Sequence, residues 1–558
     1  MSFPSFRSKS KAPVHPFGRL LWLASVCAWF AAGASIAGEP ARSSVWVSDN
    51  GDGTYTNPVL YADYSDPDVV RVGGDFYMTA SSFNCVPGLP ILHSKDLVNW
   101  DLVGYALDRN RPEEHFRVPR HAQGVWAPSF RHHEGEFYIY WGDPDFGIYM
   151  VKAADPRGPW EPPVLVKEGR GAGLIDPCPL WDDDGRAYLV HGIAGSRAGI
   201  KSVLFLQEMT PDGTSVIGEP VLVFDGHDAH PTVEGPKFYK RGDTYYILAP
   251  AGGVTHGWQL ALRSKDVLGP YEEKIVMHRG STDINGPHQG GLLELASGES
   301  WFVHFQDLGP YGRVIHLNPV NWTDGWPVMG IDADGDGTGD PVRTHRKPDV
   351  GGVFPIVAPP ESDEFDGARL GLQWQWHANP LPFWAVPNPA RGKLRLYAAQ
   401  LPEKLVSYWD VPHLLLQKFP APAFTATTRF TFAPRLEGES TGLIVMGRDY
   451  ARLSVTRTPA GLEIAQAIAR NADRGGVEEV HGRRATQGTE FWFRVRVEAD
   501  ASTRFSYSTD GENFTSIGEP FTARQGGWIG AKVGLFCSRS TWSNDSGWAD
   551  FDWFRITP

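Results

Sequence analysis

Hydrophobic and polar residues alternate in one pattern that occurs five times between residues 66 and 303. Each copy has a small, acidic or aromatic start, a Pro or Gly, an apolar strand, a turn, and a second strand rich in aromatic residues. Period-two alternation on both sides of a Gly turn predicts a β-hairpin in each copy. The copies are DPDVVRVGGDFY, WAPSFRHHEGEFYIYW, IDPCPLWDDDGRAYLV, VEGPKFYKRGDTYYIL and HQGGLLELASGESWFV, which begin at Asp66, Trp126, Ile175, Val233 and His288.

A repeat of strands every fifty residues or so, about the length of a four-stranded blade, is typical of a β-propeller. A single blade cannot bury both faces of its sheet, so blades stack around an axis, and five copies predict five blades. The first strand of each blade lies against the central channel. The residues before each Pro or Gly are therefore expected to meet in one axial pocket. These residues are Asp66, Trp126, Asp176, Glu234, and His288 with Gln289.

The predicted fold class is all-β, with the propeller at residues 45–345. A linker rich in Pro and Gly follows at residues 346–360. Alternation returns in residues 361–558, where turn signals such as Asp510-Gly511 favour an antiparallel β-sandwich. This second domain offers no cluster of carboxylates, so we expect it to support the propeller or to form a wall of the substrate cleft.

Residues 1–37 have the pattern of a signal peptide, because basic residues precede an apolar run at 20–37 that ends in Ser35-Ile36-Ala37. The pattern predicts export to the periplasm or secretion. An uncleaved anchor is the alternative, whereas Val26 disfavours a lipoprotein modification at Cys27. Without Cys27 the chain has three cysteines, which do not make a disulfide framework.

The formal net charge is −13, and no run of Lys or Arg follows the first twenty residues. This argues against nucleic acid or an anionic membrane as a partner. The chain also has 21 Trp, 18 Tyr and 30 Phe. Strands favour aromatic residues, and sugar-binding sites use them as stacking platforms, so the composition alone leaves both explanations open.

Asp66, Asp176 and Glu234 are the candidate chemical groups, because they occupy nearly equivalent places in three blades. Carboxylates that face one channel repel one another, which raises the pKa of at least one of them. A protonated acid beside an ionised base is the equipment for cleaving a glycosidic bond. A metal site is the competing use of such a cluster.

The motifs resemble those of glycoside hydrolase family 43. The similarity rests on NPVLYADYSDPDVVRVGGDFYM from Asn57, PGLPILHSKDLVNW from Pro87, and the WAPS, IDPCP, VEGP and HQGG motifs, and it covers the propeller in order. The segment SDEFDGARLGLQWQWHANP from Ser362 resembles the concanavalin-like domain of the family's β-xylosidases and α-L-arabinofuranosidases. In such relatives that domain helps to close the pocket.

The resemblance implies an inverting reaction. It gives Asp66 the role of general base, Glu234 that of general acid, and Asp176 that of the carboxylate that raises the pKa of the acid and orients it. An inverting pair needs carboxyl groups roughly 6.5–9.5 Å apart, so that a water fits between base and sugar. Asp68 lies near Asp66 in the motif, but the Pro turn favours Asp66 as the residue that reaches the pocket.

The resemblance also matches Arg313 to an arginine that holds a substrate hydroxyl and the base, although a structural ion pair is the alternative. Trp126 and Phe83 are expected in the pocket wall or in the core. His288 is a candidate for the substrate pocket or for a central ion, because relatives place a histidine near an axial calcium or water. No cofactor is expected to be required for the chemistry.

The loop at residues 332–340, with sequence DADGDGTGD, is a second calcium candidate because its alternating acids suit oxygen ligation. Arg343 stands where an EF-hand loop has its bidentate Glu. A solvated acidic loop is therefore the alternative.

The sequence predicts an exo-acting glycosidase that removes terminal β-D-xylose or α-L-arabinofuranose from hemicellulose oligosaccharides such as those of xylan and arabinoxylan. A retaining fructan or sucrose hydrolase is one alternative, but its Asn-Asp-Pro-Asn-Gly motif is replaced here by Ser65-Asp66-Pro67-Asp68-Val69. A carbohydrate-binding propeller without catalysis is the other, and it has no need for three carboxylates. Neither nucleic acid nor membrane is an expected partner beyond an N-terminal anchor.

Overall fold

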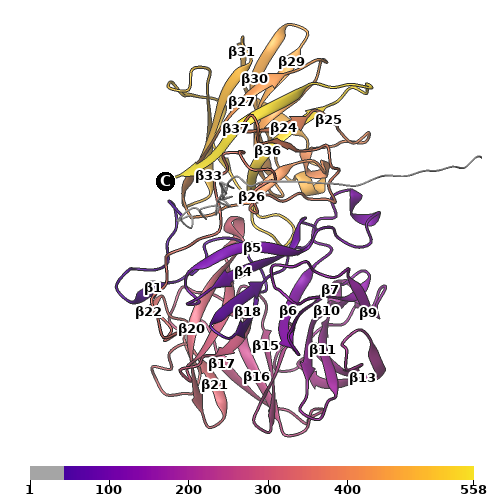
Figure 1. The fold of residues 1–558 in the computed structure, drawn as a ribbon, viewed down its shortest axis with the longest axis vertical. Helices are drawn as coiled ribbons and strands as arrows, with labels where there is room; N and C mark the ends of the chain where they lie inside the picture. The colour runs from indigo at the N-terminus through magenta and orange to yellow at the C-terminus, as the bar shows by residue number, and fades with distance from the viewer. Residues whose placement is uncertain (1–42) are drawn as a thin grey trace, which may run out of the picture. The chain divides into compact units, whose positions relative to one another are not determined.

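The computed structural model describes residues 43–558. The predicted signal peptide lies outside the described residues. In the part that is described, no helix has both the length and the apolar character needed to cross a membrane. Strands dominate, as the alternation predicts, and the fold is all-β (Figure 1).

Residues 68–329 form five antiparallel sheets, each built from four consecutive strands, and so confirm the propeller (Figure 1). The first blade has β2 (Asp68–Val72), β3 (Asp75–Thr79), β4 (Gly88–Ser94) and β5 (Trp100–Leu107). The second has β6 (Trp126–His133), β7 (Glu136–Asp143), β8 (Gly147–Ala153) and β9 (Val164–Glu168). The third has β10 (Leu174–Trp181), β11 (Ala187–Ile193), β12 (Val203–Met209) and β13 (Val216–Asp225).

The fourth blade has β14 (Lys237–Arg241), β15 (Thr244–Ala251), β16 (Trp258–Ser264) and β17 (Glu272–Met277). The fifth has β18 (His288–Glu294), β19 (Ser300–Asp307), β20 (Arg313–Thr323) and β21 (Trp326–Met329). Strand β1 (Thr54–Thr56), which precedes the first blade, pairs with β22 (Thr344–Arg346), which follows the fifth. This pairing joins the start of the propeller to its end.

Neighbouring blades bury their apolar faces against each other. Tyr77 and Ile91 of the first blade pack in one cluster with Phe130 and Ile139 of the second. A similar cluster joins the first blade to the fifth.

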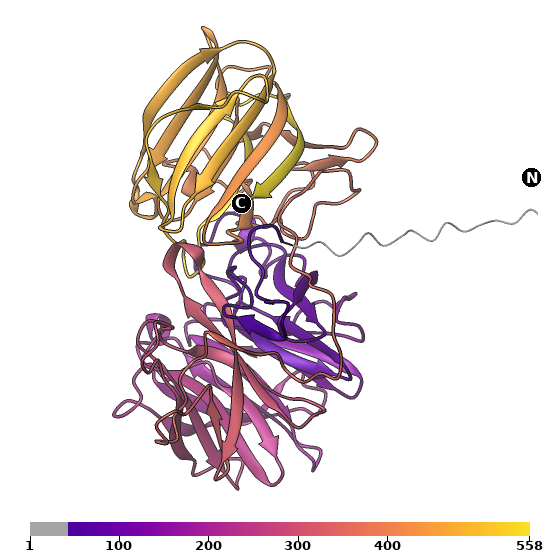
Figure 2. The same cartoon turned by 90° about the vertical axis from the view of Figure 1, so that its left-hand side faces the viewer.

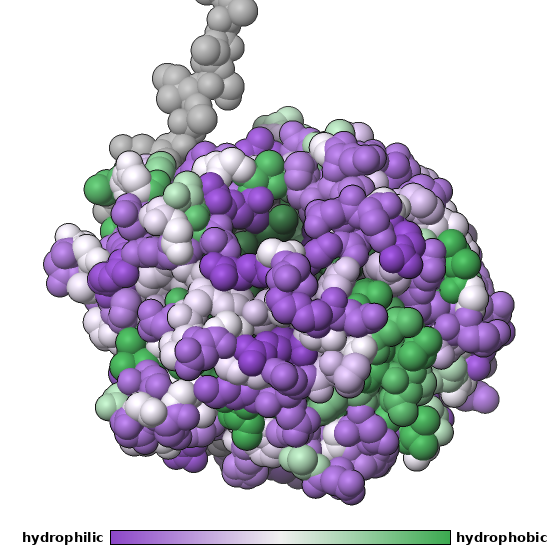
Figure 3. Space-filling view, turned by 90° about the horizontal axis from the view of Figure 1, so that it is seen from below, coloured by the Kyte–Doolittle hydropathy of each residue, from purple (hydrophilic) through white to green (hydrophobic). Residues whose placement is uncertain are grey.

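Seen from below, the exposed surface is mostly hydrophilic, with apolar residues gathered mainly toward the right of the view (Figure 3). The core therefore lies between the blades, and the axis is left for polar side chains.

The inner strands of the blades begin with an unusual backbone conformation at one repeated position. The residue directly before the Pro or Gly of each repeat has a positive φ, namely Asp66 (53°), Ala127 (31°), Asp176 (58°), Gly235 (59°) and Gln289 (30°). Residues other than Gly rarely adopt this conformation, and such strain is concentrated at functional sites. In blades two, three and five the strand pairing is also shifted at this point. In each blade the repeat therefore places a residue at or next to this position on the axis.

Residues 386–557 form the predicted sandwich, whose strands stack in two layers (Figure 2). One sheet contains β23 (Val386–Asn388), β24 (Lys393–Tyr397), β37 (Trp548–Thr557), β27 (Phe424–Ala433), β32 (Glu490–Val497), β33 (Ser502–Ser508), β34 (Thr515–Ser516) and β35 (Phe521–Thr522). The other contains β25 (Ala399–Gln400), β26 (Leu415–Lys418), β36 (Lys532–Arg539), β28 (Ser440–Met446), β29 (Tyr450–Thr458), β30 (Gly461–Ala469) and β31 (Glu478–Thr486). Side chains such as Phe430, Leu443 and Phe551 fill the space between the sheets.

Helices are confined to single turns in residues 43–558. They are α1 (Gly195–Ala198), η1 (His115–Arg117), η2 (Gly309–Tyr311), η3 (Tyr408–Asp410) and η4 (Ala472–Arg474). Cys85, Cys178 and Cys537 are buried and free, in agreement with the expectation that the cysteines form no disulfide framework.

Contacts tie the sandwich to the loop between β3 and β4 of the first blade. Val86 forms an antiparallel bridge with Trp376, and the Gln375 amide nitrogen donates to the carbonyl oxygen of Pro87 at 2.8 Å. The buried Lys532 ammonium donates to Gln375 Oε1 at 2.8 Å and to Cys85 Sγ at 3.2 Å. This loop also carries Phe83, so the sandwich is anchored close to the axial pocket.

Candidate active site

A cavity of about 210 Å³ lies at the axis where the inner strands begin. Six of the seven candidate site residues line it: Asp66, Phe83, Trp126, Asp176, Glu234 and Arg313. The seventh, His288, is buried beside it, with Nε2 3.6 Å from Glu234 Oε1. The cavity is smaller than the roughly 300–1,000 Å³ of sites for drug-sized ligands, so its size suits a single sugar ring.

Asp66 is held by three donors. Its Oδ2 accepts hydrogen bonds from the hydroxyl groups of Ser65 at 2.7 Å and Ser81 at 2.6 Å. Its Oδ1 accepts one from Arg313 Nη1 at 2.9 Å. An ionised carboxylate accepts hydrogen bonds only, so this set of donors suits a carboxylate that acts as a base.

Arg313, the first residue of β20, forms an ion pair with Asp66 and also lines the cavity. Its guanidinium lies 4.7 Å from the ring centre of Phe305 and 5.6 Å from that of Trp528. Its backbone N–H donates to Asp63 Oδ1 at 2.9 Å. Arg313 is therefore fixed in place and oriented toward Asp66.

Asp176 and Glu234 stand in an environment that favours their protonated forms. Asp176 is buried, and its Oδ2 accepts a hydrogen bond from the backbone N–H of Gly235 at 2.8 Å. Burial raises the pKa of Asp176, and the charge of Asp66 raises it further. Burial also raises the pKa of Glu234, with additional contributions from Asp176 and Asp66. The charges of Arg313 and Lys201 lower the pKa of Glu234 but do not offset burial and the two neighbouring carboxylates, so a proton is retained in this group at neutral pH.

Glu234 is the most accessible of the three carboxylates, since 29% of its side chain is exposed, against 7% for Asp66. It directly precedes the residue of positive φ in its blade, whereas Asp66 and Asp176 occupy that position themselves. This offset of one residue explains its different exposure. A protonated carboxyl that reaches the solvent-accessible part of a pocket is suited to donate a proton to a departing group.

His288 is neutral and has free hydrogen-bonding capacity. Burial and the nearby charge of Arg313 lower its pKa to about 3. Within residues 43–558, neither ring nitrogen has a hydrogen-bond partner, and Gln289 Oε1 also lacks one. Buried polar atoms are nearly always paired. A neutral imidazole nitrogen and an amide oxygen fit a water molecule or a cation at the axis.

The acidic loop at 332–340 brings carboxylate oxygens of Asp332, Asp334 and Asp336 within 4.8 Å of one another. Several of these oxygens accept backbone N–H groups of the same loop, including Gly335 N–H on Asp332 at 2.7 Å. These hydrogen bonds account for the loop conformation without an ion, so a calcium ion here stays a prediction.

Asp68 is separated from the pocket chemistry by its own partners. Its Oδ2 accepts from Arg131 Nη1 at 2.6 Å and from the Phe130 backbone N–H at 2.9 Å, and the side chain is fully buried. The residue links the first blade to the second. The choice of Asp66 over Asp68 as the pocket residue therefore agrees with the geometry.

Two kinds of pocket residue escaped the sequence analysis. Ser65 and Ser81, which hold Asp66, lie within the motifs but carried no separate signal. Trp528 comes from the sandwich, and its ring lies 6.2 Å from that of Trp126 at the cavity wall. Its neighbours Gly526 and Gly527 mark only a loop. No local pattern shows that this loop residue lies beside Arg313, which is 215 positions earlier in the sequence.

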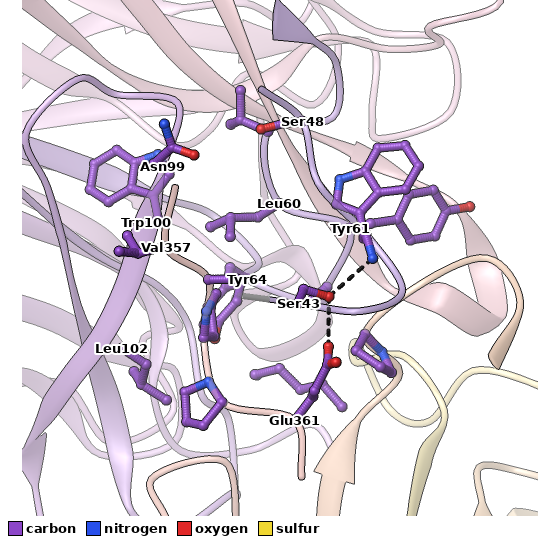
Figure 4. A pocket seen from close by; sticks show the side chains of 18 of the residues that line it. Ser43, Ser48, Leu60, Tyr61, Tyr64, Asn99, Trp100, Leu102, Val357 and Glu361 are labelled. Atoms are coloured by element: carbon purple, nitrogen blue, oxygen red, sulfur yellow. Dashed lines mark hydrogen bonds between the residues drawn. The ribbon is translucent and has the colours of Figure 1, made fainter. Parts of the chain in front are cut away.

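A second cavity, of about 70 Å³, lies between the first blade, residues 356–361 and the sandwich (Figure 4). Apolar and aromatic side chains such as Leu60, Tyr64 and Trp100 line it. Among its lining residues within the described range, the sole carboxylate is Glu361, which accepts the Ser43 hydroxyl at 2.7 Å (Figure 4). Among the described residues it has no second carboxylate to pair with Glu361, so we assign the chemistry to the axial cavity.

A five-bladed propeller with an axial group of three carboxylates and an arginine defines a glycoside hydrolase. The family model described as "Glycosyl hydrolases family 43" matches residues 55–327. The model described as "Beta xylosidase C-terminal Concanavalin A-like domain" matches residues 362–557. The chain belongs to glycosyl hydrolases family 43.

Similar proteins match both domains. A putative beta-xylosidase of Xylanibacter ruminicola is 38% identical over 87% of this chain and 86% of its own length. A non-reducing end alpha-L-arabinofuranosidase, BoGH43B, of Bacteroides ovatus is 30% identical over 90% and 94%. The solved structure of a xylan beta-1,4-xylosidase from Bacillus halodurans C-125 has a TM-score of 0.80 at 26% identity, covering 90% of this chain and 100% of that one.

Proposed function

We propose that this glycoside hydrolase removes a terminal β-D-xylose or α-L-arabinofuranose from hemicellulose oligosaccharides, with inversion at the anomeric carbon. The observation that carries the proposal is the contrast between Asp66, held by three donors, and Glu234, whose pKa is raised. The names of the relatives, beta-xylosidase and alpha-L-arabinofuranosidase, support the substrate class.

In this reaction Asp66 takes a proton from a water molecule, which attacks the anomeric carbon. Glu234 gives its proton to the departing glycosidic oxygen, so the bond breaks without a charged leaving group. Burial keeps the pKa of Glu234 high, and repulsion from the nearby carboxylates of Asp176 and Asp66 adds to this effect. Arg313 keeps Asp66 in position throughout.

Exo action is supported by the size and the walls of the cavity. A volume of about 210 Å³ admits one sugar ring, and Trp528 of the sandwich adds to the wall next to Trp126. A chain that continued in both directions would need an open groove. The terminal sugar therefore enters the cavity, and the remainder of the substrate stays outside.

The test is hydrolysis of p-nitrophenyl β-D-xylopyranoside and α-L-arabinofuranoside, and of xylobiose, by wild type and Glu234→Gln. The variant is expected to lose at least about 10²-fold in kcat on xylobiose, the scale of general acid catalysis. Glu294→Gln is the matched control, because its side chain is 54% exposed at the far end of β18. Wild-type turnover of xylobiose by Glu234→Gln contradicts the assignment. NMR of the first product anomer tests inversion.

We also propose that a calcium ion or a water molecule occupies the axis, where His288 and Gln289 would hold it. Such an ion or water molecule would bind an unpaired ring nitrogen of His288 and the unpaired Oε1 of Gln289, and it would fix the imidazole beside Glu234. If calcium is bound, chelation is expected to lower the melting temperature, and His288→Ala is expected to abolish that effect. A melting temperature that chelator and added calcium leave unchanged favours water.

The basic and apolar pattern of residues 1–37 supports our further proposal that the enzyme is exported. We expect the activity of an expressing cell to be found outside the cytoplasm. When residues 1–37 are deleted, we expect the activity to stay in the cytoplasm. Equal export of the deleted form contradicts the proposal.

A further inference from the structure

Residues 194–202 connect β11 to β12 at the end of the third blade that carries Asp176. The pairing of β10 with β11 places Ile193 opposite Leu174 and Gly192 opposite Ile175. A Cβ atom on Gly192 would lie 3.7 Å from Asp176 Oδ2 and 3.9 Å from the Cα atom of Glu234. The connecting segment therefore begins directly beside two of the carboxylates.

Arg197, in helix α1 of this segment, extends to the second blade. Its Nε and Nη2 donate to the two carboxylate oxygens of Asp145, each at 3.0 Å. Its guanidinium carbon lies 5.5 Å from the ring centre of Trp126, a residue of the cavity wall. Its Nη1 donates to Ser196 Oγ at 2.9 Å. A guanidinium has five N–H groups, so the pairing with Asp145 fixes its plane, and two N–H groups have no partner among residues 43–558.

Lys201, at the other end of the segment, extends to the fourth blade. Its ammonium donates to the Thr232 hydroxyl at 3.0 Å, and Thr232 lines the cavity two residues before Glu234. Among residues 43–558 its hydrogen-bond partner is thus a hydroxyl and not a carboxylate. The backbone N–H of Thr232 also donates to Ser202 Oγ at 2.7 Å, which fastens the segment to this side of the cavity.

Exposure gives the cavity a direction. Asp66 and Arg313 have side chains that are 7% and 8% exposed and lie deep. Glu234, Arg197 and Lys201 are more exposed, with 29% for Glu234 and 22% for Arg197. Since Glu234 protonates the departing oxygen, the leaving group must lie on this more exposed side, next to residues 194–202.

We propose that residues 194–202 form the leaving-group subsite, in which Arg197 and Lys201 donate hydrogen bonds to the hydroxyl groups of the departing sugar. The inference rests on the proposed function, because it takes the leaving group to be a second sugar. One segment of the third blade thus presents two cations, one beside the aromatic wall of the second blade and one beside the acid of the fourth. Asp145 acts as a positioning residue for Arg197.

The test measures binding in a background that does not turn over. Xylose and xylobiose are titrated by calorimetry into Glu234→Gln, and into the same protein with Arg197→Ala or Lys201→Ala. Xylobiose is expected to bind at least about tenfold more tightly than xylose. Each added substitution is expected to reduce that ratio by about three- to tenfold, the scale of a hydrogen bond from a charged donor, with the affinity for xylose unchanged. Lys201 is exposed, so its replacement leaves the fold intact.

Arg186→Ala is the matched control, because Arg186 forms an exposed ion pair with Asp184 at the opposite end of the same blade. It is expected to change neither affinity. Arg197→Lys keeps a charge beside Asp145 without the planar fork, so it is expected to recover part of the ratio. Equal affinity of Glu234→Gln for the two sugars, or a ratio that survives both alanine substitutions, overturns the subsite. If both alanine substitutions lower the ratio as expected but the wild-type protein hydrolyses neither xylobiose nor the nitrophenyl glycosides, only the proposed function is contradicted.

Discussion

At the scale of single residues, the site depends on a backbone conformation that its side chains do not favour. Asp66 and Asp176 both have a positive φ, and each directly precedes a Pro. Asp tolerates this conformation better than most residues, because its short polar side chain makes local hydrogen bonds. The three carboxylates also repel one another at short range, which is a second cost that the fold has to sustain.

Glu234→Gln is expected to stabilise the protein at alkaline pH. Burial raises the pKa of Glu234 from its ordinary value of 4.5 to about 8. At a pH between the ordinary and the raised pKa, the folded protein therefore holds a proton that the unfolded chain lacks. Stability therefore falls as pH rises through this window, and the neutral amide avoids the loss. We expect a melting temperature about 2 °C above wild type at pH 8, on the order of 1 kcal/mol, and no gain at pH 4. An equal shift at both pH values would contradict the electrostatic explanation.

Ser81→Ala is expected to impair the base. The Ser81 hydroxyl donates to Asp66 Oδ2 and accepts the backbone N–H of Ala127 at 2.7 Å. Its loss removes one donor from the carboxylate and leaves a buried N–H unpaired. We expect kcat to fall about tenfold, which corresponds to about 1.4 kcal/mol of activation free energy, the scale of one lost hydrogen bond to a charged group. Steady-state kinetics measure this effect. The exposed Ser297→Ala is the control, and equal kinetics of both variants would contradict the role.

At the scale of elements, strands determine where the carboxylates lie, and loops determine the shape of the cavity. The five inner strands deliver equivalent positions to the axis, whereas Phe83, Thr232 and Trp528 belong to connecting segments. The loop with Trp528 is fastened to the propeller, because the Gly530 backbone N–H donates to Asp63 Oδ2 at 3.0 Å. The same Asp63 holds the backbone of Arg313. The sandwich loop is thus connected to the arginine that pairs with Asp66.

Trp528→Ala is expected to weaken substrate binding more than catalysis. The substitution removes an aromatic wall beside Trp126 and Arg313. We expect KM for the preferred nitrophenyl glycoside to rise about tenfold while kcat changes less than about threefold, because the carboxylates keep their partners. Trp542→Ala provides the comparison, since that side chain is 79% exposed on the same domain. If both variants have the wild-type KM, Trp528 does not contact the substrate.

At the scale of the whole molecule, the two domains share a buried polar seam. Lys532 is 1% exposed and donates across the seam to Cys85 of the propeller. It also donates to Gln375 of its own domain, whose amide nitrogen donates to the Pro87 carbonyl oxygen of the propeller. A buried ammonium is tolerated where such partners are present. The seam fixes the sandwich relative to the loop that carries Phe83. Because Phe83 lines the axial cavity, the seam also helps to hold the cavity wall in place.

Lys532→Met is expected to loosen this seam. The apolar side chain keeps most of the volume but leaves Gln375 Oε1 without its donor, a loss of about 1–3 kcal/mol. We expect a melting temperature about 4 °C lower, by the usual relation between stability and midpoint, or two separate transitions in scanning calorimetry. Lys404→Met in a loop of the sandwich is the control, because that residue is exposed. An unchanged single transition would contradict the importance of the seam.

The sequence by itself determined the propeller, the sandwich and the axial group of Asp66, Asp176 and Glu234. These features follow from patterns within single hairpins, and a repeated hairpin brings its equivalent positions to one axis. The preference for Asp66 over Asp68 also followed from the local Pro turn. Strand alternation and turn residues act over a few positions, so a sequence displays them directly.

Tertiary structure alone decided which distant groups complete the pocket. Three features join segments that share no local pattern. Trp528 reaches the cavity from the sandwich, Asp63 accepts hydrogen bonds from the backbones of both Arg313 and Gly530, and Arg197 forms an ion pair with Asp145. The raised pKa of Glu234 likewise depends on burial and on charges from other blades. Such contacts arise because closing the ring and docking the sandwich bring loops together across the sequence, and electrostatic effects act through space rather than along the chain.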